Sequence, residues 1–136
     1  MSKTKRDPIK TLHTEAKRNA KRRGISHSIT LDNVVALAKQ ADGRCQLSGI
    51  EFSDEMITGS VRPYAASIDR IDSAVGYHPG NVRLVCIAVN NAMREWGEIV
   101  LYVLLSAILS KHMENLNVEE EGPQGRPGEV GREAGR

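Results

Sequence analysis

Aromatic side chains are scarce in this sequence, whose 136 residues include one Trp, one Phe and three Tyr. Proteins that bind single-stranded nucleic acid without sequence preference stack successive bases on several exposed rings. The shortage of rings therefore disfavours that mode of binding. Hydrophobic residues make up 40% of the chain and charged residues 26%, which is the balance of one soluble globular domain with a modest core.

Cysteines and long apolar runs are also few. The chain has two cysteines, Cys45 and Cys86, and its first residues are basic and polar, unlike the apolar stretch of a secretory signal. The longest apolar run, residues 99–109, is too short to span a membrane and is typical of a core helix. We therefore expect a cytoplasmic protein with reduced thiols and no membrane partner. A disulfide between the two cysteines would require an oxidising compartment.

Positive charge is concentrated before Gly24, although the net charge of the whole chain is only +2. Nine basic residues in this segment stand against two acidic ones, Asp7 and Glu15. The segment is either an electrostatic footprint for a polyanion or a solvated terminus kept soluble by its charge. The sequence favours a helix over residues 11–23 that ends at the glycine. In the first case, the nucleic-acid-binding residues of this helix are Lys17, Arg18, Lys21, Arg22 and Arg23.

Helical and strand-like patterns then alternate. Thr30 is a typical N-cap for an amphipathic helix that Gly43 ends. Residues 45–52 predict a short hairpin around a Ser-Gly turn, and residues 65–71 and 81–86 are strand-like.

A further helical pattern follows the second strand, is broken near Gly97 and resumes over residues 98–112. Gly, Pro, Glu and Arg dominate residues 117–136, which we expect to be a disordered tail. We therefore divide the chain into a basic N-terminal helix or arm (1–24), a folded domain (25–116) and this tail.

Residues 67–93 combine side chains that suit phosphodiester chemistry. Hydrolysis of a phosphodiester needs a cation that stabilises charge on oxygen atoms and a base that deprotonates water. A hard divalent ion such as Mg²⁺ prefers a few oxygen ligands and completes its octahedron with phosphate and water. Asp69 lies at the end of one predicted strand, and Asn90 and Asn91 lie at the start of the helix that follows the next strand. A carboxylate and an amide in these positions can form the protein's part of such a site.

These residues belong to a longer pattern that resembles the ββα-metal motif of HNH (His-Me finger) endonucleases. The residues that carry the resemblance are Asp69-Arg70-Ile71, Gly76, Asn81-Val82, Val85-Cys86 and Asn90. More narrowly, the stretch SIDRIDSAVGYHPGNVRLVC resembles a group of small, mostly phage-encoded HNH-like proteins, which also share an Arg-rich segment ending in Gly and a hairpin like CQLSGIEF here. The resemblance covers residue 20 to about residue 109. It implies an α+β fold with a ββα-metal core over residues 65–96, preceded by a short hairpin and flanked by helices. If a phage encodes the chain, the expected location is the host-cell cytoplasm.

The resemblance also implies a function and a set of site residues. The function is a metal-dependent DNA endonuclease that uses one divalent ion, Mg²⁺ or Mn²⁺, and no small-molecule cofactor. Asp69 and Asn90 would bind the metal, and Asn81 would brace the loop and orient the base. The arginines that would join the basic helix in contacting DNA phosphates are Arg62, Arg70 and Arg83. Such contacts to the backbone give strong salt dependence and little sequence specificity. The sequence leaves RNA open as a substrate.

One departure from the family affects the base. The family has a histidine directly after the metal-binding acid, and this chain has Arg70, which cannot accept a proton. Three interpretations remain. The arginine contacts the scissile phosphate while Asp72 or His78 handles the water; the metal itself supplies hydroxide; or the core is inactive and the chain is a DNA-binding or packaging accessory protein. The presence of both metal-ligand positions favours cleavage.

A second departure concerns zinc. Many HNH proteins brace the core with paired Cys-x-x-Cys knuckles, but here Cys45 is followed by Ser48 and Cys86 by Val89 at the matching positions. Two thiols cannot complete a four-coordinate structural site, so we expect no structural zinc and instead apolar packing of the hairpin.

Some of these residues also have a purely structural interpretation. Asp69 stands between two isoleucines in a strand and needs a partner, which is either the metal or an arginine such as Arg62, Arg70 or Arg83. Asp72, before a loop, is as typical of a turn cap as of a catalytic carboxylate. Trp96 is expected in the core.

Overall fold

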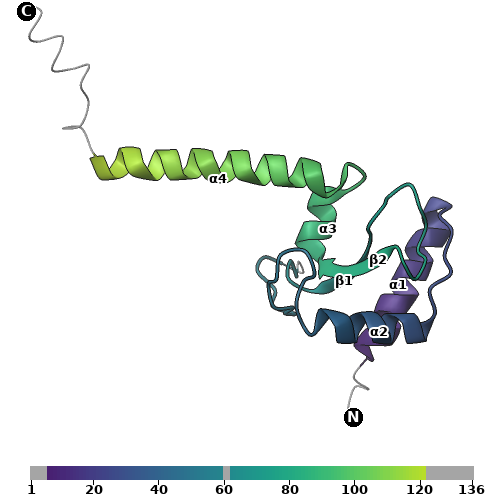
Figure 1. Cartoon of the computed structure of the whole chain (residues 1–136). Coiled ribbons are helices and arrows are strands. Elements are labelled where there is room, and N and C mark those ends of the chain that lie inside the picture. Colours follow the sequence, from purple (N-terminus) through teal and green to yellow (C-terminus); the bar gives the residue numbers. More distant parts are fainter. Residues whose placement is uncertain (1–5, 60–61, 122–136) are drawn as a thin grey trace, which may run out of the picture. The chain divides into compact units, whose positions relative to one another are not determined.

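The computed structural model describes residues 6–59 and 62–121. Its elements are drawn in chain order in Figure 1 and comprise α1 (Pro8–Arg23), α2 (Leu31–Ala41), β1 (Ala66–Arg70), β2 (Val82–Cys86), α3 (Ile87–Met93) and α4 (Gly97–Glu121). Residues up to Glu98 form one compact unit, and the chain from Ile99 forms a second, which we describe separately. The combination of helices with a small antiparallel sheet confirms the predicted α+β class.

Local signals explain where the first two helices begin and end. Asp7 caps α1 by accepting a hydrogen bond from the Ile9 amide at 3.0 Å, so this helix begins three residues before the predicted start at residue 11. Gly24 ends it in the left-handed conformation, with φ of 65°. Thr30 caps α2, as predicted, and forms a reciprocal capping box with Asn33.

The strands and the third helix form the ββα unit. β1 pairs antiparallel with β2 in a register that sets Ile68 opposite Leu84 and Asp69 opposite Arg83. The helix α3 follows β2 directly. One hydrophobic core joins this sheet to the apolar faces of α1 and α2. Ala20 of α1 is among the most buried residues of this core. The predicted strand, strand and helix are therefore all present and lie against the N-terminal helices.

The loop between β1 and β2 is fastened to the segment after α1. The Tyr77 amide donates to the Ser26 carbonyl at 2.9 Å, and the Ser28 amide donates to the Tyr77 carbonyl at 2.8 Å. Gly76 lies directly against Ser26, and a Cβ atom there would clash with the Ser26 carbonyl oxygen and hydroxyl. Glycine is therefore required by this close approach, which fixes α1 beside the loop.

The predicted hairpin over residues 45–52 is a tight turn closed by one isolated bridge between Arg44 and Glu51, without regular strands. It is joined to β2, since the Gln46 amide donates to the Leu84 carbonyl and the Leu84 amide donates to Gln46 Oε1, at 2.8 and 2.7 Å. These two hydrogen bonds hold the turn against the middle of β2.

The two cysteines are buried beneath this turn as free thiols. Cys45 Sγ accepts hydrogen bonds from the Ser48 and Cys86 amides at 3.4 and 3.3 Å. Burial acts to raise the pKa of Cys45, but the Ser48 side chain and the neighbouring main-chain amides outweigh it and lower this pKa to about 7. Burial raises the pKa of Cys86. The thiols thus fill the space between turn and sheet.

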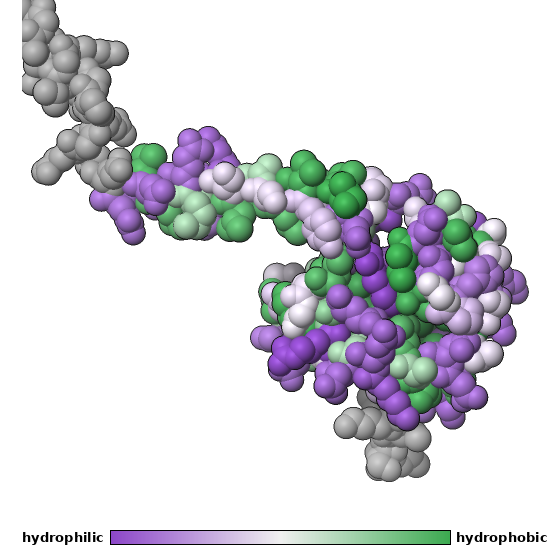
Figure 2. Space-filling model, viewed as in Figure 1, coloured by the Kyte–Doolittle hydropathy of each residue, from purple (hydrophilic) through white to green (hydrophobic). Residues whose placement is uncertain are grey.

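The second unit begins within α4, and here two expectations were wrong. Residues 99–109 do not form a core helix, because their large side chains are exposed except for Leu101. The helix also continues to Glu121, into the predicted tail of residues 117–136; the rest of that tail lies outside the described residues. Green hydrophobic side chains are visible along α4 in Figure 2. By length and composition alone, residues 97–120 could cross a membrane.

Candidate functional site

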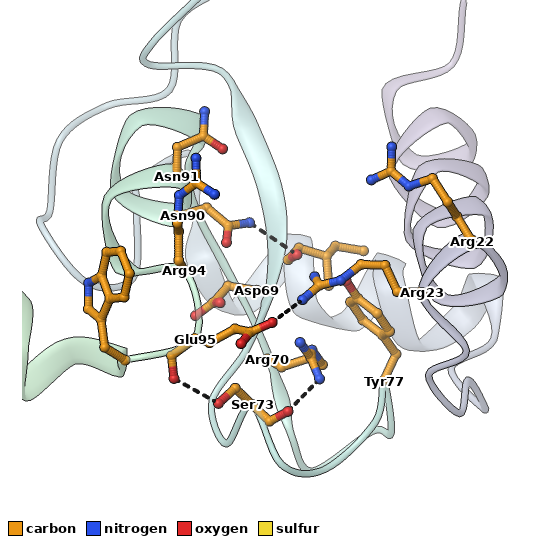
Figure 3. A pocket seen from close by; sticks show the side chains of 12 residues that line it. Arg22, Arg23, Asp69, Arg70, Ser73, Tyr77, Asn90, Asn91, Arg94 and Glu95 are labelled. Atoms are coloured by element: carbon orange, nitrogen blue, oxygen red, sulfur yellow. Dashed lines mark hydrogen bonds and ion pairs between the residues drawn. The ribbon is translucent and has the colours of Figure 1, made fainter.

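A pocket of about 650 Å³ opens on the ββα unit and reaches across to α1. It takes side chains from the end of β1, the following loop, α3 and the turn after it, and the end of α1 (Figure 3). Its lining residues are Arg22, Arg23, Ile68, Asp69, Arg70, Ser73, Tyr77, Asn90, Asn91, Arg94, Glu95 and Trp96. Four arginines face two carboxylates in this set, so the pocket carries net positive charge and suits an anion.

Asp69 is the most buried polar residue of the site, with 8% of its surface exposed. Its Oδ2 accepts a hydrogen bond from Arg83 Nε at 2.9 Å across the strand pair. Burial raises the pKa of the Asp69 carboxyl and outweighs the opposing effect of Arg83. The structural interpretation, an ion pair with one of three candidate arginines, is thus confirmed for Arg83, while the carboxyl still lines the pocket.

Arg83 needs a correction, because its described contacts are internal. Besides Asp69, its guanidinium donates to Glu98 Oε2 at 2.7 Å and to Met93 Sδ at 3.7 Å, and its side chain is 14% exposed. It does not line the pocket. Its register position opposite Asp69 makes it a structural cation that positions the acid, in place of the predicted phosphate contact.

Asn90 shares the pocket wall with Asp69. Its Nδ2 donates to Ser67 Oγ at 3.1 Å and to the Ile68 carbonyl at 3.4 Å, which fixes the amide against β1. Figure 3 shows the Asn90 carbonyl oxygen on the side of Asp69. The structure therefore brings together the two predicted metal-binding side chains.

The donor atoms of this pair fit a hard divalent ion. A carboxylate and an amide carbonyl are the oxygen ligands that Mg²⁺ accepts, and Mg²⁺ keeps several waters in place of further protein ligands. Among the described residues, no group of three or more His, Cys, Asp or Glu side chains is arranged to hold a metal. The described residues therefore do not form a metal site made of protein ligands alone. Asp69 and Asn90 suit an open site in which substrate and water would supply the other ligands.

Arg70, at the position of the family's histidine, holds the loop after β1. It donates to the Ser73 carbonyl at 2.6 Å and to the Val75 carbonyl at 3.3 Å, and its guanidinium lies 5.5 Å from the centre of the Tyr77 ring. It also lines the pocket. Arg70 therefore fixes the loop and adds positive charge.

Asn81 braces the same loop, which is the structural part of its predicted role. Its Nδ2 donates to the carbonyls of Asp72 and Gly76 at 3.0 and 2.9 Å, and its Oδ1 accepts from the Asp72 amide at 2.9 Å. One side chain thus satisfies main-chain groups at the start and in the middle of the loop.

The two residues considered as bases do not line the pocket. Asp72 Oδ1 accepts a hydrogen bond from the Ala74 amide at 2.9 Å, so Asp72 is the turn cap of the structural interpretation. His78 is bonded through its two ring nitrogens to the hydroxyls of Ser26 and Ser28. Both side chains fasten the loop, which favours their structural interpretation; a role for either in the chemistry stays a prediction.

The basic helix contributes only its C-terminal end to the pocket. Arg22 and Arg23 line it, and Arg23 forms an ion pair with Glu95 at 3.3 Å. The remaining predicted DNA-binding residues are exposed but lie outside the pocket lining: Lys17, Arg18, Lys21 and Arg62.

Sequence reasoning missed three residues that follow α3 in the turn at its end. Arg94 has φ of 44° and ψ of −125°, a conformation that costs free energy in a non-glycine residue. Glu95 places an exposed carboxylate in the pocket. Trp96 is 52% exposed and lines the pocket, so its expected place in the core was wrong; its Nε1 donates to the Ala92 carbonyl at 3.0 Å. Their closeness along the chain to Asn90 was the available signal.

No family model matches the sequence, and no curated protein matches it significantly. Among solved structures, the chain is similar to the rare-cutting HNH restriction endonuclease PacI, with a TM-score of 0.59 and 19% sequence identity over 86% of this chain and 87% of that chain. A likeness at this identity shows the fold alone. The chain therefore has an HNH-endonuclease-like fold, which confirms the predicted ββα core. The narrower resemblance to phage-type proteins stays a prediction.

Proposed function

We propose that the chain is a metal-dependent endonuclease that hydrolyses DNA phosphodiester bonds in the pocket of the ββα unit. One observation carries the proposal: the Asp69 carboxyl and the Asn90 amide lie together on the wall of a pocket that four arginines line. The likeness in fold to an HNH restriction endonuclease supports it. A polyanionic substrate and an oxygen-bound cation are the partners that this combination suits.

Asp69 and Asn90 would hold one Mg²⁺ or Mn²⁺ ion through their oxygen atoms. When bound, the ion stabilises negative charge on the phosphate and leaving oxygens. Arg83 keeps the Asp69 carboxyl in place by its 2.9 Å bond, and Ser67 and Ile68 orient the Asn90 amide.

The phosphate groups are bound by arginines of the pocket. Arg94 forms no hydrogen bond through its guanidinium to the described part of the chain, so this cation is available to substrate. Within the described residues, the Arg22 guanidinium donates only to Asn19 Oδ1, at 3.3 Å. The exposed basic side chains of Lys17, Arg18 and Lys21 extend the positive surface along α1. Binding through phosphates predicts affinity that falls steeply with salt.

Glu95 is our candidate for the base that takes the proton of the attacking water. Of the two carboxylates in the pocket, Asp69 is buried and paired with Arg83, whereas the Glu95 side chain is 80% exposed and forms its ion pair with Arg23. Glu95→Gln should lower kcat strongly while KM changes little. An unchanged kcat would rule this role out.

The test of the function is nicking of supercoiled plasmid with Mg²⁺ or Mn²⁺, and with EDTA as the metal-free control. We expect Asp69→Asn and Asn90→Ala to abolish nicking. Their matched controls, Asp72→Asn and Asn91→Ala, should retain it, because Asp72 lies outside the pocket and Asn91 makes no hydrogen bond to β1 that would orient it. Nicking that survives Asp69→Asn would exclude this pocket as the active site.

The alternative is an inactive HNH-fold protein that binds DNA or assists packaging. Arg70, which cannot act as a base, favours it. DNA binding without cleavage across several divalent metals would support this alternative and refute the enzyme. Competition between duplex DNA and RNA in the same assays identifies the preferred nucleic acid.

A further inference from the structure

The apolar surface of α4 is large and has no partner in the described residues of its own unit. Eleven large hydrophobic side chains from Ile99 to Val118 are between 40% and 68% exposed. Contiguous apolar surface on this scale marks a site of interaction. This surface is independent of the pocket and of the proposed nuclease activity.

A membrane is a poor partner for this helix. The run of residues 99–109, apolar except for Ser106, covers only about 16 Å along the axis, against roughly 30 Å of hydrocarbon in a bilayer. Beyond it, Lys111 and Glu114 form an ion pair at 3.8 Å within the length that would have to be inserted. Glu119 and Glu120 would also be repelled by anionic lipid head groups.

One apolar stripe follows residues 102–116 of this 25-residue helix. At about 100° per residue its members fall within an arc of about 80° and extend for about 21 Å. They are Tyr102, Leu105, Leu109, Met113 and Leu116, all at least 40% exposed. Within this length, Lys111 and Glu114 are on the opposite side, so no charged side chain interrupts the stripe.

The order of the stripe is symmetric. Successive members are separated by three, four, four and three residues, so that Leu109 is the centre and the spacing is the same in both directions. A two-fold contact requires a surface that is complementary to itself. In an antiparallel pair of such helices, Leu109 meets Leu109 of the second copy, Leu105 meets Met113, and Tyr102 meets Leu116.

We propose that α4 is a homodimerisation element that pairs antiparallel with α4 of a second copy of this chain, with Leu109 on the two-fold axis. Charge favours this orientation over the parallel one. In a parallel pair, Glu119 and Glu120 of the two helices would lie side by side and repel each other, whereas the antiparallel arrangement places them at opposite ends. The helix dipoles also oppose one another favourably.

The first test measures the molar mass of the full chain by sedimentation over a roughly hundredfold range of concentration. A single chain has a mass of 14.9 kDa, and we expect twice this value at high concentration. Leu109→Glu places two like charges on the axis and should give a monomer. The matched control, Leu104→Glu, changes an exposed leucine about 140° away around the helix and should stay dimeric.

The second test determines the orientation by oxidative cross-linking. Tyr102→Cys and Leu116→Cys chains should cross-link when mixed and should not cross-link alone, because residue 102 of one copy faces residue 116 of the other. Cross-linking of each variant with itself would instead indicate a parallel pair and refute the proposal. The native thiols are buried and should not contribute.

Three results would overturn the proposal: a monomer at all concentrations, a dimer that survives Leu109→Glu, or a monomer that binds neutral phosphatidylcholine vesicles through α4. Circular dichroism that matches the wild type confirms that each variant is folded, so a loss of dimer is then a loss of the interface.

Discussion

The ion pair between Asp69 and Arg83 allows a quantitative test of how the site is held. We predict that Arg83→Met will destabilise the fold by about 3 kcal/mol near neutral pH, because removing one partner of a buried pair costs roughly 3–5 kcal/mol. The two side chains are 10% and 14% exposed, so solvent screens them little. The accompanying loss of the Glu98 contact adds little, since that carboxylate is 38% exposed.

The lower end of this range is expected because Asp69 can take up a proton. Burial already raises the pKa of this carboxyl, and the loss of Arg83 raises it further. When the pKa of a carboxyl is higher in the folded state than in the unfolded state, the carboxyl costs no stability at pH values below its unfolded-state pKa. The free energy of unfolding then falls as the pH rises through the folded-state pKa. The penalty of Arg83→Met should therefore be small at acidic pH and reach its full size near neutral pH.

Urea unfolding followed by circular dichroism at several pH values measures both quantities. The double variant Arg83→Met with Asp69→Asn removes the unpaired charge and should recover part of the loss and most of the pH dependence. A loss below about 1 kcal/mol at neutral pH, or a double variant no more stable than Arg83→Met, would contradict the view that Arg83 neutralises a buried acid.

Three further predictions concern the segments around the pocket. Arg94→Gly should raise stability by about 1 kcal/mol, since glycine adopts φ of 44° without strain, and should weaken DNA binding measured by titration at low salt; unchanged binding would argue against a phosphate contact. Gly76→Ala should destabilise by at least about 2 kcal/mol in urea unfolding, because its Cβ would clash with Ser26, and an unaltered midpoint would contradict the close approach. Burial and the neighbouring His13 lower the pKa of His27 below 6.5, and its Nε2 has no hydrogen-bond partner among the described residues. The free energy of unfolding should therefore fall as pH drops from above 6.5 through the lowered pKa. His27→Phe should flatten this pH dependence, and an equally steep profile would assign it to other groups.

The elements that position the site could be predicted because local signals define them. The Thr30 cap and the Gly24 stop mark helix ends, and the strand-like composition of residues 65–71 and 81–86 predicts the paired strands, all without reference to distant residues. Asp69 and Asn90 could be chosen because a carboxylate in an apolar strand and an amide on an apolar helix require partners.

The partners themselves depend on tertiary contacts that no local pattern contains. Three arginines were candidates for Asp69, and only the strand register selects Arg83. The sequence could not decide whether the Asp72 carboxylate is catalytic or caps a turn, because both roles suit an aspartate that precedes a loop. The exposure of residues 99–109 was missed for a related reason, since an apolar run indicates burial without saying which surface covers it.

The pocket takes Arg22 and Arg23 from a helix that ends more than forty residues before β1 begins. Excising the ββα segment as a minimal module would therefore remove one side of its own cleft, together with the loop anchorage at Ser26. A portable version of this domain has to start no later than the Asp7 cap, and any gene fusion that trims the amino-terminal helix should be judged as an alteration of the site itself.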